Sequence, residues 1–423
     1  MCKKSLFSTV LAATLLVTAD HAQSITKKFA FGVDKPISNV AQVEAESIYS
    51  TQKGFGFEPG AAVVCKRGTD NCTNDKPFYF SVALPEANYK VTVTFGDKTA
   101  ATSTVVKAEL RRLMLEKVET PKGRFVTRSF IVNIRTPQIS TGGEVKLKDR
   151  ENASEKWAWD GKLTIEFNGP HPAVSGITIE QVNVPTVFLL GDSTVCDQPS
   201  EPYASWGQMF TRFFSDKVAI ANHAESGESL KSSLGAKRLE KVLSLAKPGD
   251  YLMIQYAHND EKEKGEGVGA MTTFKASLKQ FIEAFQKKGG TVMVVTPMHR
   301  RTFDNGGKIT NSHGDYPEAA RQAAREEGVA LIDLTVMSKN LYEALGPQGS
   351  GVLFKDGDAT HHDNYGAYEL ARCIVQAIRD QKLPIAKYLI DGIPAFNPKK
   401  PDPLAAFTVP ASPAVTDQKP LGN

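Results

Sequence analysis

The sequence predicts a two-domain chain, in which an all-β domain precedes an α/β domain with a parallel sheet. Its 423 residues exceed the size at which a single hydrophobic core usually stops growing. Residues 23–183 contain short strand-like runs between turns, with almost no helical periodicity. Over residues 184–395, strand-like runs alternate with helix-like runs, which is typical of a parallel sheet covered by helices on both faces.

The front half has the pattern of a β-sandwich of the jelly-roll kind, because its strands are short and evenly spaced. We expect strands at 78–82, 89–95, 124–132, 162–167 and 174–182. Trp157 and Trp159 flank a loop, where they either stack on a sugar or, as we favour, are buried at the edge of the sandwich. Cys65 and Cys72 close a small loop and could form a disulfide.

The back half is expected to carry the parallel sheet. Its predicted strands are 187–190, 218–221, 251–256, 292–295 and 330–334, and its predicted helices are 204–214, 237–245, 273–288, 316–327, 336–345 and 365–379. Residues 396–423 are rich in proline and predict an irregular tail.

The N-terminus has the pattern of a signal peptide, assigned to residues 1–22. Lys3 and Lys4 precede an apolar run over 6–19 that is followed by polar residues. This run is short for a membrane span, so we expect export to the periplasm or the cell exterior, followed by removal of the segment.

Composition argues against several classes of function. The net charge of +4 is spread over a long chain without a dense basic run, which disfavours nucleic-acid binding. The sequence has no Walker, HExxH or EF-hand motif and no Cys/His cluster with zinc spacing. We therefore expect neither a metal nor a cofactor.

Four polar clusters follow predicted strands or precede the last helix. They are Asp192-Ser193, the stretch 222–229, the stretch 257–260 and the stretch 356–362. Open parallel sheets bind their ligands at the carboxyl ends of the strands, so these clusters are expected to lie on one rim.

Each cluster supplies a group that acyl transfer requires. Ser193 is the candidate nucleophile, and His361 is the base that would take its proton. Asp358 would hold the imidazole in the correct tautomer. The Ser193 and Gly227 backbone N–H groups and the Asn259 side-chain amide are candidate donors to an oxyanion.

These blocks, GDSTV, NHAESGES, AHND and DATH, resemble the four blocks of the SGNH (GDSL-like) hydrolase family over about residues 184–391. The resemblance implies a three-layer α/β/α, flavodoxin-like domain. The stretches GDSTV and QYAHND look most like rhamnogalacturonan acetylesterases, which deacetylate pectin. Residues 29–32, 49–50 and 54–57 look like the galactose-binding-like β-sandwich that precedes some of these esterases.

The resemblance implies removal of acetyl groups from a plant cell-wall polysaccharide, with acetylated rhamnogalacturonan as the expected substrate. One alternative is an acetylesterase that acts on another glycan such as xylan. The other is a carbohydrate-binding protein whose hydrolase domain is inactive.

The chain departs from the family pattern at Glu228, where family members commonly have arginine, and this charge reversal puts the charge pattern of the substrate in doubt. Asp192 and Asp260 are interpreted as structural, and His362 as packed or lining the rim. Four residues are candidates for substrate binding: His258, His223, Arg300 and Arg301. The two arginines either meet uronate carboxylates or form a solvated basic turn.

Overall fold

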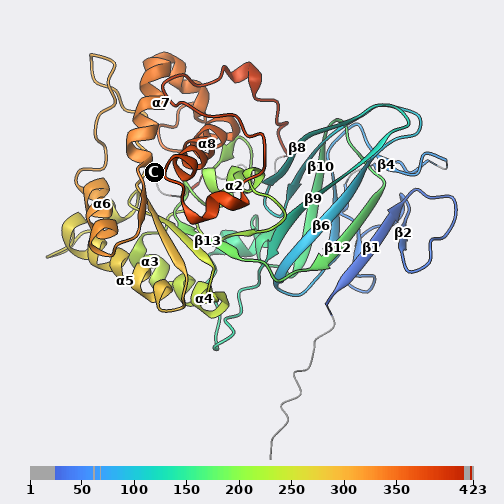
Figure 1. Ribbon diagram of the computed structural model, residues 1–423, viewed down its shortest axis with the longest axis horizontal. Helices are drawn as coiled ribbons and strands as arrows, with labels where there is room; N and C mark the ends of the chain where they lie inside the picture. Colours follow the sequence, from blue (N-terminus) through green and yellow to red (C-terminus); the bar gives the residue numbers. More distant parts are fainter. Residues whose placement is uncertain (1–23, 61, 67, 414–419, 422–423) are drawn as a thin grey trace, which may run out of the picture.

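The computed structural model describes residues 24–60, 62–66, 68–413 and 420–421. The predicted signal peptide lies outside these residues. Two domains stand side by side, a β-sandwich and an α/β domain (Figure 1). In the part of the chain that is described, no helix is both long enough and apolar enough to cross a membrane.

The front domain consists of two five-stranded sheets packed face to face. One sheet has the order β2-β1-β12-β6-β9 and the other β3-β5-β10-β7-β8. The strands are β1 (Thr26–Phe31), β2 (Ala41–Val43), β3 (Phe55–Phe57), β4 (Cys72–Thr73), β5 (Phe78–Ala83), β6 (Ala87–Gly96), β7 (Thr102–Ala108), β8 (Arg112–Thr120), β9 (Phe125–Ile134), β10 (Lys162–His171), β11 (Ala173–Val174) and β12 (Gly176–Gln181).

Alternation of side chains along these strands builds the sandwich core. In β6, for example, Tyr89, Val91, Val93 and Phe95 are buried while the residues between them are partly exposed. Successive side chains of a strand point to opposite faces, so such alternation places one face against the other sheet. Near the edge of the domain, Cys65 and Cys72 form a disulfide.

The back domain contains a parallel sheet in the order β15-β13-β16-β17-β18. Its strands are β13 (Thr186–Gly191), β15 (Ala219–Asn222), β16 (Tyr251–Gln255), β17 (Thr291–Val295) and β18 (Ala330–Ile332), and a separate antiparallel pair joins β14 (Tyr203–Ala204) to β19 (His362–Asp363). This is the 2-1-3-4-5 order of flavodoxin-like folds, whose ligands bind where the order reverses, at the ends of the first and third strands. Here those strands are β13 and β16.

Helices cover both faces of this sheet, as the alternating pattern predicts. Val187 and Leu189 of β13 pack with α2, α7 and α8, whereas Phe188 and Leu190 pack with α3, α4, α5 and α6. The helices are α2 (Trp206–Phe210), α3 (Leu230–Gly235), α4 (Arg238–Leu245), α5 (Lys275–Gln286), α6 (Tyr316–Glu326), α7 (Leu334–Gly349) and α8 (Asn364–Asp380), with the π-helical turn η4 (Ala270–Phe274) before α5. The three-layer α/β/α fold is therefore confirmed.

The structure contains elements that the sequence analysis does not predict, among them β1, β7 and β8 of the sandwich and α3 of the α/β domain. Strands β7 and β8 lie at the junction of the two domains and contain charged residues. Lys107 and Arg112 are in fact buried. The helix expected over 204–214 is shorter, because α2 ends at Phe210 and a 3₁₀ turn, η2 (Thr211–Phe213), follows.

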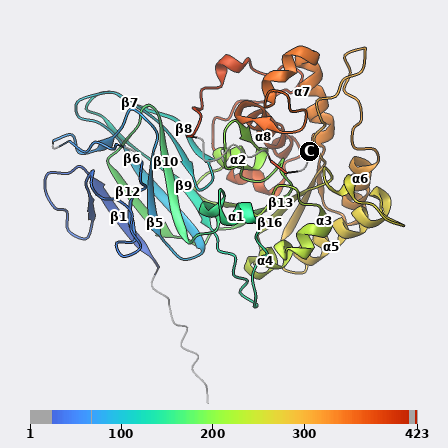
Figure 2. The ribbon, with the colours of Figure 1, turned by 180° about the vertical axis from the view of Figure 1, so that it is seen from behind.

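Buried ion pairs join the two domains. Arg112 of β8 donates from Nε to Asp197 Oδ2 at 2.7 Å, and both side chains are 1% exposed. The short helix α1 (Asp149–Asn152), which lies between the domains in Figure 2, contributes Glu151, and its Oε2 accepts from Arg238 Nη2 at 2.6 Å. A charged side chain that is buried at such an interface destabilises the fold unless its partner from the other domain is present.

The proline-rich tail is irregular, but it is docked. Only one 3₁₀ turn, η7 (Leu404–Ala406), is found in its described part. Lys107 of the sandwich donates from Nζ to the Pro410 carbonyl and to Ser412 Oγ, both at 2.7 Å. The chain thus returns from the α/β domain to complete the surface of the sandwich.

We predict that Arg112→Met lowers the free energy of unfolding by about 3–5 kcal/mol, because it leaves the Asp197 carboxylate buried without its cation. The matched control is Arg212→Met. Arg212 also pairs across the domains, with Glu116 at 2.6 Å, but both side chains are 23% exposed, so the loss there should stay within about 1 kcal/mol. Urea denaturation measures both values, and equal losses would contradict the prediction.

Candidate active site

Ser193 lies directly after β13, in a turn that its neighbours fix in place. Asp192 Oδ1 accepts hydrogen bonds from the Thr194 N–H at 2.9 Å and the Thr194 hydroxyl at 2.7 Å. The Ser193 carbonyl accepts from Gln198 Nε2 and from Ser205 Oγ, both at 2.7 Å. The serine is therefore held by bonds to its backbone, which leave its side chain free for chemistry.

Gly191 allows the sharp turn because a larger residue would not fit. A Cβ at this position would lie 2.6 Å from the Gln255 carbonyl oxygen and 2.5 Å from Val195 Cγ2. Only glycine permits this close approach of two backbones. The requirement for glycine at the first position of the GDS block is thus steric.

Ser193 comes together with Asp358 and His361, although the serine is far from both of them in the sequence. His361 Nε2 lies 3.0 Å from Ser193 Oγ, and His361 Nδ1 lies 3.0 Å from Asp358 Oδ2. Pairing of β14 with β19 sets Ala204 opposite His362. This pairing anchors the histidine loop beside the segment that follows Ser193.

The Asp358 carboxylate is arranged to stay ionised. Burial alone would raise its pKa, but a hydrogen bond from the His361 ring and others from the His361 and Thr360 backbone N–H groups lower it below the usual value. The same carboxylate therefore orients the imidazole and fixes its tautomer.

The three predicted oxyanion donors lie at the same rim. Gly227 has a φ of +76°, which favours glycine, and none of the described hydrogen bonds uses its N–H or that of Ser193. Asn259 Nδ2 donates to the Glu228 carbonyl at 3.0 Å, so this bond ties the amide to the loop that contains Gly227. An amide nitrogen carries two hydrogens, and the second remains available to a substrate.

Glu228 does not face the substrate, contrary to the concern that the sequence raised. Its side chain is 1% exposed, and Oε1 lies 3.0 Å from Lys148 Nζ and 3.4 Å from Arg238 Nε. The Ser232 hydroxyl donates to its other oxygen. The charge that replaces the family arginine is neutralised inside the protein.

His223 and His258 do not line a cleft, so their prediction as substrate-binding residues is wrong. The His223 ring packs between Trp159 and Phe188, and burial lowers its pKa well below the ordinary value. His258 is 0% exposed, with Nδ1 3.4 Å from Asp192 Oδ2. Burial lowers the pKa of His258 to about 4, so its neutral ring supports the nucleophile turn.

Arg300 and Arg301 are only partly exposed, and both have partners inside the protein. Arg300 forms an ion pair with Glu261 at 2.5 Å. Arg301 donates from Nη2 to the Pro347 carbonyl at 2.6 Å, and its backbone N–H donates to the Ala359 carbonyl at 2.7 Å. Arg301 thus steadies the loop that carries Asp358 and His361.

Three further side chains have structural positions. His362 Nε2 forms a hydrogen bond of 2.7 Å with the Tyr342 hydroxyl. Burial lowers the pKa of His362 to about 3, so this ring is packed inside the protein and does not line the rim. Trp159 is 7% exposed and donates to Glu151 Oε1 at 3.0 Å, which confirms the prediction of burial. Trp157 packs against the Tyr79 ring, with 5.1 Å between centroids.

The front domain supports the oxyanion loop through residues that the sequence did not indicate. Lys148 Nζ donates to the Ser226 carbonyl at 2.5 Å, and Glu151 binds the Arg238 guanidinium that also meets Glu228. No short-range pattern marks these residues, because their partners lie about 80 positions further along the chain. The sandwich is therefore part of the structure that positions the site.

Three carboxylates at this interface could in principle hold a cation. One oxygen each from Glu151, Glu155 and Glu225 lies within 4.8 Å of the others, and all three residues are buried. Arg150 pairs with Glu155 and Arg238 with Glu151. Arg150 Nε also lies 3.8 Å from Glu225 Oε1, so each of the three carboxylates faces an arginine and we interpret the cluster as an internal ion-pair network.

The end of the described tail lies against the oxyanion loop. A Cβ built on Gly227 would be 2.9 Å from Leu421 Cβ, and the neighbouring Pro420 is buried. Ser193 and His361 are only 1% and 2% exposed. The catalytic groups are thus almost completely buried.

Fold and site together define a class, the carboxylic-ester hydrolases with a three-layer α/β fold. Residues 189–367 match the GDSL-like Lipase/Acylhydrolase family. The chain belongs to this family, because it is also 39% identical over 219 residues to the rhamnogalacturonan acetylesterase RhgT of Bacillus subtilis, which covers 48% of this chain and 94% of the relative.

A second relative extends over both domains. The uncharacterized esterase YxiM of Bacillus subtilis is 28% identical over 370 residues, which cover 84% of this chain and 91% of the relative. The crystal structure of YxiM aligns with 85% of this chain and 99% of its own, with 26% identity and a TM-score of 0.47. A probable rhamnogalacturonan acetylesterase of the same organism, YesY, is 33% identical over 48% of this chain and 97% of its own length.

Asp260 provides a prediction about pH, because burial raises its pKa to about 7. Its Oδ1 accepts from the Leu230 N–H at 2.9 Å, which fits the predicted structural role. Between pH 4 and pH 7 the unfolded carboxyl has lost its proton while the folded one keeps it, so the stability of the native chain falls as pH rises.

We predict that Asp260→Asn removes this loss. The variant should match the native chain near pH 4 and exceed its free energy of unfolding by about 2–4 kcal/mol at pH 8. Urea denaturation across this range measures the difference, with the exposed Asp75→Asn as the control. A difference that does not grow with pH would contradict the raised pKa.

Proposed function

We propose that the protein removes acetyl groups from a plant cell-wall polysaccharide, and that acetylated rhamnogalacturonan is its substrate. The observation that carries the reaction type is the 3.0 Å approach of His361 Nε2 to Ser193 Oγ. Two relatives whose names state rhamnogalacturonan acetylesterase activity, at 39% and 33% identity, support the substrate.

In the first half of the reaction, His361 Nε2 takes the Ser193 hydroxyl proton while Oγ attacks the acetyl carbonyl carbon. Negative charge develops on the carbonyl oxygen. The Ser193 N–H, the Gly227 N–H and the Asn259 amide stabilise it. The tetrahedral intermediate collapses, and the sugar oxygen leaves with the proton from His361.

In the second half, His361 takes a proton from water, and the hydroxide adds to the acetyl-serine carbonyl. Collapse of this second intermediate releases acetate, and Ser193 Oγ recovers its proton from His361. Asp358 stabilises the imidazolium in both halves. The proposal needs no metal or cofactor in any step.

A small acyl group suits the near-complete burial of the nucleophile. Ser193 is 1% exposed, and Leu421 lies against the oxyanion glycine. An acetyl group adds only one methyl beyond the carbonyl, so little space is needed around Ser193. This supports acetyl esters over esters of long chains.

We predict that the purified protein hydrolyses 4-nitrophenyl acetate and that Ser193→Ala lowers kcat/KM at least ~10³-fold, because the nucleophile is lost. The exposed Ser140→Ala is the matched control and should keep full activity.

Acetate release should be at least tenfold faster from acetylated rhamnogalacturonan than from acetylated xylan.

The outcomes separate the alternatives. Activity that survives in Ser193→Ala overturns the assigned nucleophile. Glycan binding by a native chain that releases no acetate from any substrate identifies a carbohydrate-binding protein. Faster release from xylan assigns the enzyme to that glycan.

We also propose that the protein is exported. Lys3 and Lys4 before an apolar run have the pattern of a signal peptide, and the Cys65–Cys72 disulfide fits an oxidising compartment. We predict that mass spectrometry of protein from the periplasm or medium finds an N-terminus near residue 23. Full-length protein confined to the cytoplasm would contradict export.

A further inference from the structure

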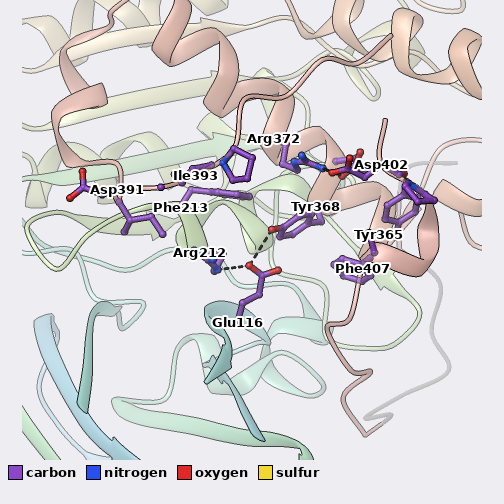
Figure 3. Close-up of a pocket in the computed structure, with 16 residues that line it drawn as sticks. Glu116, Arg212, Phe213, Tyr365, Tyr368, Arg372, Asp391, Ile393, Asp402 and Phe407 are labelled. Carbon is purple, nitrogen blue, oxygen red and sulfur yellow. Dashed lines mark hydrogen bonds and ion pairs between the residues drawn. The ribbon is translucent and has the colours of Figure 1, made fainter. Parts of the chain in front are cut away.

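A cavity of about 210 Å³ lies between the two domains, outside the ester site. Its walls come from β8, η2, α8 and two segments that follow α8, and Figure 3 shows their side chains around it. The lining residues that matter here are Glu116, Arg212, Tyr368, Glu369, Arg372 and Phe407. None of them has a part in the proposed reaction.

Aromatic rings form one wall of this cavity. The Tyr368 ring lies 5.3 Å from the Phe213 ring and 5.3 Å from the Phe407 ring, measured between centroids. Tyr368 and Phe407 are only partly buried, so part of each ring remains open to a ligand. Such rings offer a flat apolar surface beside polar groups.

Ion pairs hold the polar groups of the cavity in fixed positions. Glu116 Oε2 accepts from Arg212 Nε at 2.6 Å and from the Tyr368 hydroxyl at 3.2 Å. Arg372 Nη1 donates to Glu369 Oε1 at 2.8 Å and to Asp402 Oδ2 at 2.7 Å. These bonds use only some of the available oxygens and N–H groups.

One carboxylate oxygen in the wall has no partner. Glu369 is 1% exposed, and its Oε2 is buried without a hydrogen bond among the described residues. Buried polar atoms are nearly always hydrogen-bonded, so an orphan oxygen beside a cavity indicates a missing donor. Burial raises the pKa of Glu369, which is consistent with its lack of a full set of donors.

The charge around the cavity restricts the class of ligand. Glu116, Glu369, Asp391 and Asp402 outnumber Arg212 and Arg372, so the lining is acidic and disfavours an anion. A neutral ring with several hydroxyls can donate to carboxylates, accept from guanidinium groups and place its C–H face on Tyr368 or Phe407. The volume corresponds to roughly seven water molecules, which is suited to one sugar ring.

We propose that this cavity binds one neutral pyranose unit of a glycan, at a site separate from Ser193. Glu369 Oε2 accepts a hydrogen bond from a hydroxyl group of the sugar, and the rings of Tyr368 and Phe407 pack against the C–H face of the sugar. The choice of a rhamnoside as one of the probes below rests on the proposed function. The binding of a neutral sugar at this position does not depend on the proposed function.

The test measures saccharide binding to the full chain carrying Ser193→Ala, by calorimetry and ligand-observed NMR. The probes are methyl α-L-rhamnopyranoside, methyl β-D-xylopyranoside and D-galacturonate. We expect a neutral glycoside to bind, with galacturonate at least tenfold weaker. Phe407→Ala and Glu369→Gln, each added to this background, should weaken binding about tenfold, which corresponds to one lost hydrogen bond or ring contact.

Two controls keep the result interpretable. Asp380→Asn removes a carboxylate from the same helix, α8, outside the cavity, and should leave binding unchanged. In chains that keep Ser193, Phe407→Ala and Glu369→Gln should hydrolyse 4-nitrophenyl acetate at the native rate, which shows that the fold is intact. Glu369→Gln preserves the size of the side chain, so it remains informative if Phe407→Ala is unstable.

Absence of binding by any neutral glycoside overturns the proposal, as does binding that both cavity variants leave unchanged. Galacturonate that binds as tightly as the neutral glycosides overturns the assignment of a neutral sugar. A native chain that binds a glycoside here and releases no acetate refutes the proposed function alone. Acetate release without cavity-dependent binding refutes the second site alone.

Discussion

Buried charges at the domain interface are the constraint on which the rest of the structure depends. Asp197 follows the nucleophile turn and pairs with Arg112 of the sandwich, while Arg238 of the α/β domain pairs with Glu151. Leaving such a charge unpaired in the interior is far more costly than losing an exposed pair. The nucleophile turn and the oxyanion loop are therefore both fixed by the front domain. A chain cut before residue 184 would lose these partners, so deletion of the sandwich cannot separate glycan binding from support of the site.

Much of the α/β domain and its site could be predicted, because the relevant signals are local. Apolar runs such as 187–190 mark buried parallel strands, and the rule that ligands bind at strand ends brings Ser193 and Asn259 to one rim. Asp358 and His361 share one loop, so their contact follows from their spacing. The geometry of these side chains agrees with what the four blocks of sequence predict.

The errors concern side chains whose surroundings are set by distant residues. A histidine beside a catalytic block suggests a ligand contact, but His223 is enclosed by Trp159 of the other domain. Charged side chains are usually exposed, and the sequence analysis does not single out Arg112, which is 1% exposed because Asp197 compensates its charge across the interface. The same applies to Glu228, whose partner Lys148 lies in the front domain. Burial of a charge depends on long-range pairing, which one sequence does not reveal.

The docked tail has a consequence for the order in which the chain reaches its native state. Lys107 belongs to the first domain to be synthesised, but its ammonium group is buried against Pro410 and Ser412. Until residues 410–412 have left the ribosome, this lysine lacks two of its acceptors. The surface of the sandwich is therefore complete only after the α/β domain and residues 410–412 have been synthesised. Lys107 and the segment that contains Pro410 and Ser412 are thus coupled in folding, although the active site lies between them in the sequence.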